Sequence, residues 1–135
     1  MSDAATNEML PEFMGFVDNA RQGRLAFPYC RICGKFHWYP MPRCPHCRGN
    51  EIEWRQVSGR GQLFSFTRVM HAFDKSRADA LPYVVALIEF ADAPGVRLVT
   101  NIVGGRHDAL RIGQPVAPVF LLDGKGRPVV EFRAV

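Results

Sequence analysis

Several features of other protein classes are missing from this sequence of 135 residues. No apolar run approaches the ~20 residues that a membrane-spanning helix needs. The first residues also lack the basic and apolar segments of a secretory signal peptide. We therefore expect a soluble, cytoplasmic protein. Cysteine is scarce, and all four cysteines fall into two CxxC pairs, which leaves none for a disulfide or a nucleophile elsewhere.

Catalytic signatures are missing as well. The sequence contains no GxSxG elbow, no HExxH helix and no GxxxxGKS/T phosphate loop. His71 and Asp74 could act as a base and its orienting partner, but two polar residues of one loop are more often simply solvated. We therefore expect a protein that is not an enzyme on its own.

Strong charge of either sign is also absent. The formal net charge of +4 counts the cysteines as neutral thiols; four thiolates subtract four charges and a zinc dication returns two, which leaves +2. Arg31, Lys35, Arg43 and Arg48 lie in or beside the cysteine pairs, where they can offset the charge of a thiolate site. The basic balance is therefore weak evidence for a polyanionic partner.

The clearest motif in the sequence consists of two CxxC pairs separated by ten residues, Cys30 with Cys33 and Cys44 with Cys47. A tetrahedral thiolate site takes two ligands from each of two tight turns, and this spacing leaves room for one short hairpin. We predict one structural Zn²⁺ held by these four cysteines, with no open position for a catalytic water. A rubredoxin-type iron site, a disulfide framework and a redox CxxC are the alternatives.

The residues around the cysteines allow two further predictions. Four thiolates complete a tetrahedron, so we expect His37 and His46 to be exposed or to support the ligands from outside the coordination shell. Before the cysteines, apolar residues recur at helical spacing over residues 11–21, and Gly23 is placed to end a helix. The aromatic face of this helix either packs on its own chain or docks on another subunit.

The remainder of the chain is rich in strand signals. Alternating and apolar segments predict five strands, over residues 63–70, 82–90, 96–103, 116–122 and 129–132, with at most one helical turn at residues 108–112 between the third and fourth. This order is typical of an OB-type barrel, although a small sandwich also fits.

A series of motifs follows one another along the chain: the helix, Cys30-x-x-Cys33-Gly34, Pro42-Arg43-Cys44-Pro45-x-Cys47, Trp54, Ser58-Gly59-x-Gly61, Pro82-Tyr83, Gly95-Val96-Arg97 and Ile112-Gly113-x-Pro115-Val116. In order and spacing, these motifs resemble the DUF35 family of acyl-CoA-associated proteins, which combine a zinc ribbon with an OB-fold. The resemblance covers residues 12–132. The family fold implies a mainly β protein with an N-terminal helical arm (1–24), a rubredoxin-like four-cysteine zinc ribbon (25–50) and a C-terminal five-stranded OB-fold barrel (51–135).

The resemblance also implies a function. Members of the family look like small subunits associated with thiolase-fold enzymes (thiolases, aldolases and ketoacyl synthases) or with MaoC-type enoyl-CoA hydratases. Their pathways include ketoacyl synthesis and the degradation of sterol side chains and aromatic acids. We therefore expect a non-catalytic accessory subunit that handles acyl-CoA beside such an enzyme.

Two sets of residues are candidates for this role. In an OB barrel the loop after the first strand borders the usual ligand face. Here that loop could place cations near CoA phosphates and an aromatic ring near adenine or an acyl chain; the alternative is a mobile charged loop. The candidate acyl-CoA residues are His71, Phe73, Lys75 and Arg77. The candidate partner interface is Phe13, Phe16, Val17, Phe36 and Trp38, because so small a module has little core in which to bury them.

Binding of single-stranded nucleic acid is the alternative function, since OB barrels and zinc ribbons both serve it. Phe64, Phe66 and Arg68 alternate onto one predicted face, which could stack bases beside a cation. Phenylalanines in alternating strands are more often core residues, however.

Overall fold

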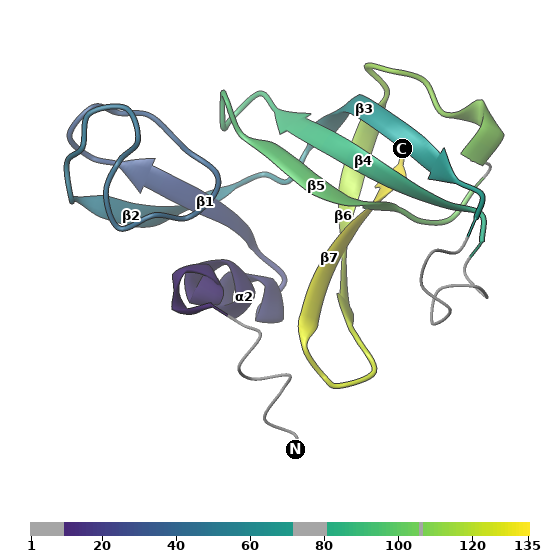
Figure 1. The fold of residues 1–135 in the computed structure, drawn as a ribbon, viewed down its shortest axis with the longest axis horizontal. Helices are drawn as coiled ribbons and strands as arrows, with labels where there is room; N and C mark the ends of the chain where they lie inside the picture. Colours follow the sequence, from purple (N-terminus) through teal and green to yellow (C-terminus); the bar gives the residue numbers. More distant parts are fainter. Residues whose placement is uncertain (1–9, 72–80, 106) are drawn as a thin grey trace.

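The computed structural model describes residues 10–71, 81–105 and 107–135. A small two-stranded sheet lies at one end of the molecule and a five-stranded barrel at the other, with a short helix beneath the junction between them (Figure 1). Among the described residues, no helix is long and apolar enough to cross a membrane.

The N-terminal segment forms a 3-10 turn, η1 (Pro11–Phe13), followed directly by the helix α2 (Met14–Arg21). Pro11 is tolerated in the first turn because the N–H that it lacks would have no partner there. Gly23 adopts a φ of +74° just after the helix, and its N–H bonds to the Ala20 carbonyl. The predicted helix over residues 11–21 is therefore present.

Close contact between α2 and the ribbon depends on Gly15. A Cβ atom at this position would overlap the indole ring of Trp54, so the helix backbone lies directly on that ring. Glycine has a lower helix propensity than alanine, and the close packing of the helix on Trp54 offsets this cost. The helix buries Val17 and Ala20 against the rest of the chain.

The ribbon sheet consists of β1 (Leu25–Cys30) and β2 (Ile52–Val57). The two strands pair antiparallel along their whole length, from Leu25 opposite Val57 to Cys30 opposite Ile52. The predicted division after residue 50 therefore separates two strands that the structure pairs. The sheet of the ribbon continues to Val57.

The barrel is built from β3 (Gly61–Val69), β4 (Tyr83–Phe90), β5 (Arg97–Ile102), β6 (Pro115–Leu122) and β7 (Pro128–Ala134). Its strand order is β3-β4-β5-β7-β6, closed by pairing of β3 with β6, and the short helix η3 (His107–Ala109) lies between β5 and β6. This confirms the mainly β fold with five barrel strands and a helical insertion between the third and fourth.

A β-bulge in β3 changes which side chains face the barrel core. The pairing register with β4 shifts between Leu63 and Ser65, so Phe64 is an extra residue in the strand. Phe66 then pairs with buried Ala86 and packs against the core, whereas Phe64 is 37% exposed. The prediction that Phe64 and Phe66 share one face is wrong, because strict alternation cannot anticipate a one-residue shift.

One hydrophobic core extends from the helix through the ribbon into the barrel. Phe27 of β1 is fully buried, and its ring lies 5.2 Å from that of Phe90 in β4, which in turn lies 5.9 Å from Phe132 in β7. Ala20 and Leu25 belong to the same cluster. The ribbon is therefore attached to the barrel by buried aromatic packing as well as by the connecting chain.

Candidate metal centre and its surroundings

The four cysteines converge at the tip of the ribbon. Their sulfur atoms all lie within 4.8 Å of one another, and the Cys30–Cys47 and Cys33–Cys44 pairs are each 3.6 Å apart. Four thiolates around one zinc at ~2.3 Å lie about 3.8 Å from each other. The cluster therefore fits a tetrahedral metal site with ligands Cys30, Cys33, Cys44 and Cys47.

Each cysteine pair lies on a tight turn closed by a main-chain hydrogen bond. The Gly34 N–H bonds to the Cys30 carbonyl at 2.9 Å, and the Arg48 N–H to the Cys44 carbonyl at 2.8 Å. Both donors have positive φ, +72° at Gly34 and 66° at Arg48. Such turns point two sulfur atoms to the same side, which a shared metal requires.

Main-chain N–H groups also point at the sulfur atoms. His46 donates to Cys44 Sγ and Gly49 donates to Cys47 Sγ, each at 3.3 Å. These bonds stabilise negative charge on sulfur, so they suit thiolates better than thiols. They orient the ligands from outside the coordination shell.

Ionisation of all four thiols together requires a cation. Without a metal, burial and the neighbouring thiols raise the pKa of Cys33 to about 12. Burial opposes ionisation of Cys44, but N–H bonds from Cys47 and His46 lower its pKa to about 6. Four thiolates at this spacing repel one another, and a bound dication removes that repulsion.

Salt bridges attach the first knuckle to β2. Arg31 lies 3.4 Å from Glu51 and 3.9 Å from Glu53, and Glu53 also pairs with Arg55 at 2.6 Å. Arg55 stacks over the Tyr29 ring at 3.6 Å. One of the four cations counted beside the cysteines, Arg31, is therefore matched by Glu53 in β2 and by Glu51 just before it.

The two histidines of the ribbon differ from each other. His46 is exposed, as expected, and its ring nitrogen Nε2 lies 3.4 Å from the Phe36 carbonyl. His37 is only 4% exposed, and neither of its ring nitrogens has a hydrogen-bond partner. The prediction for His37 is therefore wrong: it is buried, and its ring supports no ligand sulfur.

The aromatic residues of the helix pack on the ribbon of their own chain. The Phe13 ring contacts those of Trp38 and Tyr39 at centroid distances of 5.9 and 5.6 Å, and Phe16 lies 5.1 Å from Trp38. Val17 is buried, whereas Phe13, Phe16 and Trp38 are half-buried. The Phe36 ring meets that of Tyr29 edge to face, with the ring centroids 4.9 Å apart. This leaves the partner interface a prediction, and Val17 can contribute to it only indirectly.

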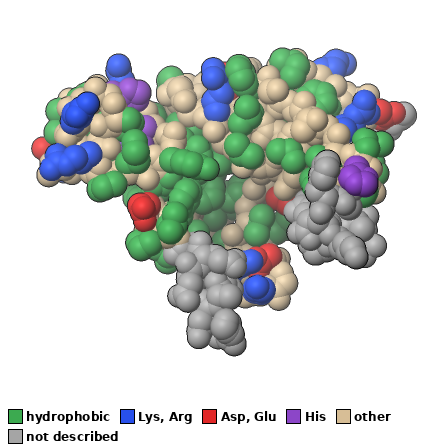
Figure 2. Space-filling view, in the orientation of Figure 1, with side chains coloured by type: hydrophobic (Ala, Val, Ile, Leu, Met, Phe, Trp, Pro, Cys, Tyr) green, Lys and Arg blue, Asp and Glu red, His purple; other side chains and the backbone are tan. Residues whose placement is uncertain are grey.

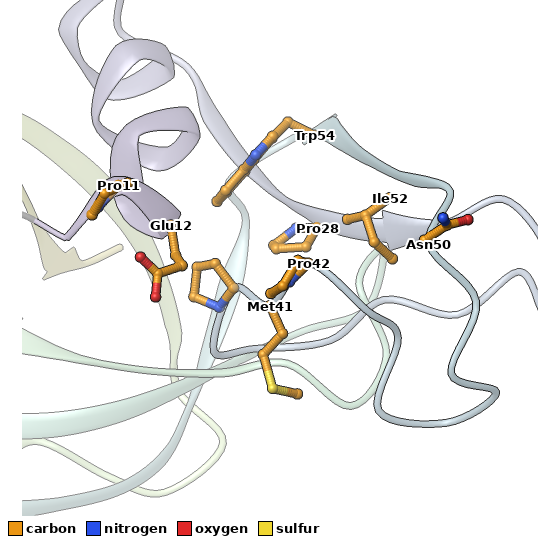
Figure 3. A pocket seen from close by; sticks show the side chains of 9 residues that line it. Pro11, Glu12, Pro28, Met41, Pro42, Asn50, Ile52 and Trp54 are labelled. Atoms are coloured by element: carbon orange, nitrogen blue, oxygen red, sulfur yellow. The ribbon is translucent and has the colours of Figure 1, made fainter.

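A hollow of about 470 Å³ opens beside this aromatic cluster (Figure 3). Side chains from η1, from the loop between the knuckles and from β1 and β2 surround it; they are Pro11, Glu12, Pro28, Pro40, Met41, Pro42, Asn50, Ile52 and Trp54. Tyr39, 66% exposed, and Met41, 41% exposed, lie nearby in the inter-knuckle loop. Apolar side chains gather where the ribbon meets the helix in Figure 2. Sequence reasoning missed the hollow, although the closely spaced prolines were a possible signal.

The predicted acyl-CoA residues lie mostly outside the described part of the chain. Phe73, Lys75 and Arg77 fall in residues 72–80, and so does Asp74. His71 is exposed, just after the end of β3. The acyl-CoA site at this loop, like the suggestion of a base and orienting partner there, stays a prediction.

Comparison with known proteins assigns both parts of the chain to one family. Residues 18–53 match the family model for the rubredoxin-like zinc ribbon domain of ChsH2, and residues 54–121 match that for the ChsH2 C-terminal OB-fold domain. The chain is also similar to a chain of the solved Ltp2-ChsH2(DUF35) aldolase, with 32% sequence identity, a TM-score of 0.82, and coverage of 93% of this chain and 96% of that one.

Two curated relatives differ in length from this chain. A probable enoyl-CoA hydratase alpha subunit of Thermomonospora curvata is 39% identical over 101 residues, covering 75% of this chain but 30% of that protein. A DUF35 domain-containing scaffold protein of Methanocaldococcus jannaschii is 33% identical over 92 residues, covering 67% of this chain and 63% of that protein. The chain thus spans about a third of the hydratase subunit and somewhat under two thirds of the scaffold protein.

Proposed function

Because the chain belongs to the DUF35 family of ChsH2-type zinc-ribbon and OB-fold proteins, we propose that it is an accessory subunit of an enzyme that acts on CoA thioesters. The observation that supports this most directly is its near full-length likeness to a chain of the Ltp2-ChsH2(DUF35) aldolase. The names of the two relatives, a hydratase alpha subunit and a scaffold protein, support the same role. The proposed partner is a thiolase-fold or MaoC-type hydratase subunit.

The metal in this proposal is one zinc ion with a structural role. Cys30, Cys33, Cys44 and Cys47 would hold it, and it would supply a cross-link between the two knuckles. The family description of the domain as a zinc ribbon supports zinc, and four thiolates fill a tetrahedron and leave no position for substrate. The chain's own residues contribute the N–H bonds to sulfur and the salt bridges that keep the ribbon in shape.

We place catalysis on the partner. Within residues 10–71, 81–105 and 107–135, the four cysteines are the one group of three or more side chains placed to hold a metal ion, and thiolates that fill a tetrahedron leave no open position for a catalytic water. Acyl-CoA would contact this chain through the predicted residues His71, Phe73, Lys75 and Arg77, and would react on the partner.

The partner would dock on the apolar surface around the hollow of Figure 3. Tyr39 and Met41 are exposed there, and Met14 on the helix is 43% exposed. Exposed apolar patches on soluble proteins commonly mark interfaces. The predicted interface residues Phe13, Phe16 and Trp38 would form the layer beneath and hold this surface in shape, since their rings contact each other.

Co-purification tests this proposal. The gene is co-expressed with candidate thiolase-fold and hydratase subunits of the host, and turnover of acyl-CoA is measured for each chain alone and for the complex. We expect turnover from the complex and none from this chain alone. Robust turnover by the isolated, homogeneous chain, or failure of every candidate enzyme to bind it, would overturn the proposal.

Substitution of exposed apolar residues tests the docking surface. A Tyr39→Ser, Met41→Ser double variant removes two exposed apolar side chains, and we expect partner affinity to fall about tenfold or more. Val99→Ser is the matched control, because Val99 is 62% exposed on the barrel and far from the hollow in sequence and sheet position. Equal affinity of the two variants would place the interface elsewhere.

A further inference from the structure

A second hollow, of about 490 Å³, lies on the ribbon where it faces the barrel. It is bounded by residues 34–38 and His46 on the ribbon side and by Pro94 and Gly95 on the barrel side. These two residues belong to the turn between β4 and β5, which extends toward the ribbon in Figure 1. Of these residues, Phe36 and Trp38 also belong to the predicted partner interface.

His37 is the unusual member of this lining. Its side chain is 4% exposed, and both Nδ1 and Nε2 are buried without a hydrogen-bond partner. The main chain of Met41 is close enough to favour the charged ring slightly, but it does not have the geometry of a hydrogen bond. Buried polar groups without partners are rare in folded proteins, because burial removes the bonds that water would make.

Among the other residues of the lining, Lys35 is a cation and none is acidic. Lys35 and His46 are both exposed at the rim, and the remaining residues are aromatic, glycine or proline. Burial, together with the neighbouring His46, lowers the pKa of His37, so the empty hollow holds a neutral imidazole.

We propose that this hollow binds an oxyanion, the phosphate or carboxylate group of a small molecule, which accepts a hydrogen bond from His37 and pairs with Lys35. Such a group would satisfy the buried ring and match the charge of the rim. The apolar body of the ligand would lie on Phe36 and Trp38. The proposal does not depend on the accessory role.

Titration of the zinc-loaded full chain with inorganic phosphate, and separately with acetate, tests the site. NMR follows the ring nitrogens of His37 and the amides of Gly34 and Gly95. We expect saturable chemical-shift changes at all three residues. The anion that binds with higher affinity shows whether the site prefers a phosphate or a carboxylate group. Lys35→Met should weaken binding by about tenfold or more, since hydrogen bonds to charged groups are among the strongest. Because Lys35 is exposed, this substitution should leave the protein folded.

Lys125→Met is the matched control, because Lys125 is an exposed cation in the hairpin between β6 and β7. It should leave phosphate and acetate affinity unchanged. His37→Phe, which keeps a ring of similar size, should abolish the shifts at the two glycines. The proposal would be overturned by non-saturable shifts, by equal weakening in both lysine variants, or by crystals in phosphate that show only a water molecule at His37.

Discussion

The ribbon and the barrel are stabilised in different ways although they share a core. The barrel closes five strands around buried side chains such as Leu63, Ile88 and Val116. The ribbon has two strands, and its tip contains four cysteines in place of an apolar interior. A segment this short cannot bury enough apolar surface to offset its conformational entropy, so the metal must contribute the difference. Phe27 of the ribbon contacts Phe90 of the barrel and so joins the two parts.

The strongest test of this difference is removal of the metal. Chelation, or the Cys44→Ser variant, should unfold the ribbon, since structural zinc binding contributes ~10 kcal/mol or more. Both tryptophans of the chain, Trp38 and Trp54, lie in the ribbon, so their fluorescence reports on the ribbon and on the helix packed against it. We expect the tryptophan signal to change while barrel amides stay protected from hydrogen exchange. Loss of protection across the barrel at the same time would show that the two parts fold as one unit. Stoichiometric iron in the purified protein would show that the metal is iron and not zinc.

Substitution at the junction should affect both parts. Phe27→Ala removes a fully buried ring that contacts Phe90, and core substitutions of this kind cost about 3 to 5 kcal/mol. Chemical unfolding, followed by tryptophan fluorescence and by far-ultraviolet circular dichroism, should show both signals shifted to lower denaturant. Phe132→Ala is the control inside the barrel and should leave the tryptophan transition closer to that of the parent. A Phe27→Ala variant that shifts one signal only would mean that the parts are coupled weakly.

A smaller effect is expected where the helix meets the ribbon. Gly15→Ala should raise helix propensity by about 1 kcal/mol, yet the new methyl group overlaps the Trp54 indole. Overpacking of this kind costs about 1 to 3 kcal/mol, so we expect net destabilisation measured by thermal unfolding. Asp18→Ala, on the exposed side of the same helix, is the control and should be neutral or slightly stabilising. If Gly15→Ala stabilises the protein, the helix does not lie on Trp54.

The smallest effect concerns the hairpin between β6 and β7. N–H bonds from Arg127 and Lys125 hold the pKa of Asp123 below its usual value. A carboxylate with a lowered folded-state pKa adds stability above its unfolded pKa of ~3.9, and this contribution is lost as the pH falls through the folded pKa. Melting temperature measured from about pH 5 downward should therefore fall less steeply for Asp123→Asn than for the parent. Parallel curves would show that Asp123 adds no pH-dependent stability, and the tryptophan signal of the ribbon should be the same in both proteins.

Features that depend on residues close together in the chain could be predicted from the sequence. The metal site is one, because two CxxC turns ten residues apart can bring four sulfur atoms together through local geometry alone. The barrel strands and the insertion between the third and fourth are others, since alternation and turn residues are local signals. The order of these motifs was specific enough to indicate the family.

Tertiary structure decided the rest, because packing between segments distant in the chain produces no periodic pattern in the sequence. Only the fold shows that β2 pairs with β1, that Gly15 lies on Trp54, and that a bulge turns Phe64 outward. His37 illustrates the limit most clearly. Because four thiolates complete the metal site, the sequence predicted that His37 is exposed or supports the ligands from outside, yet the fold buries it beside the turn between β4 and β5, where it lines a second hollow.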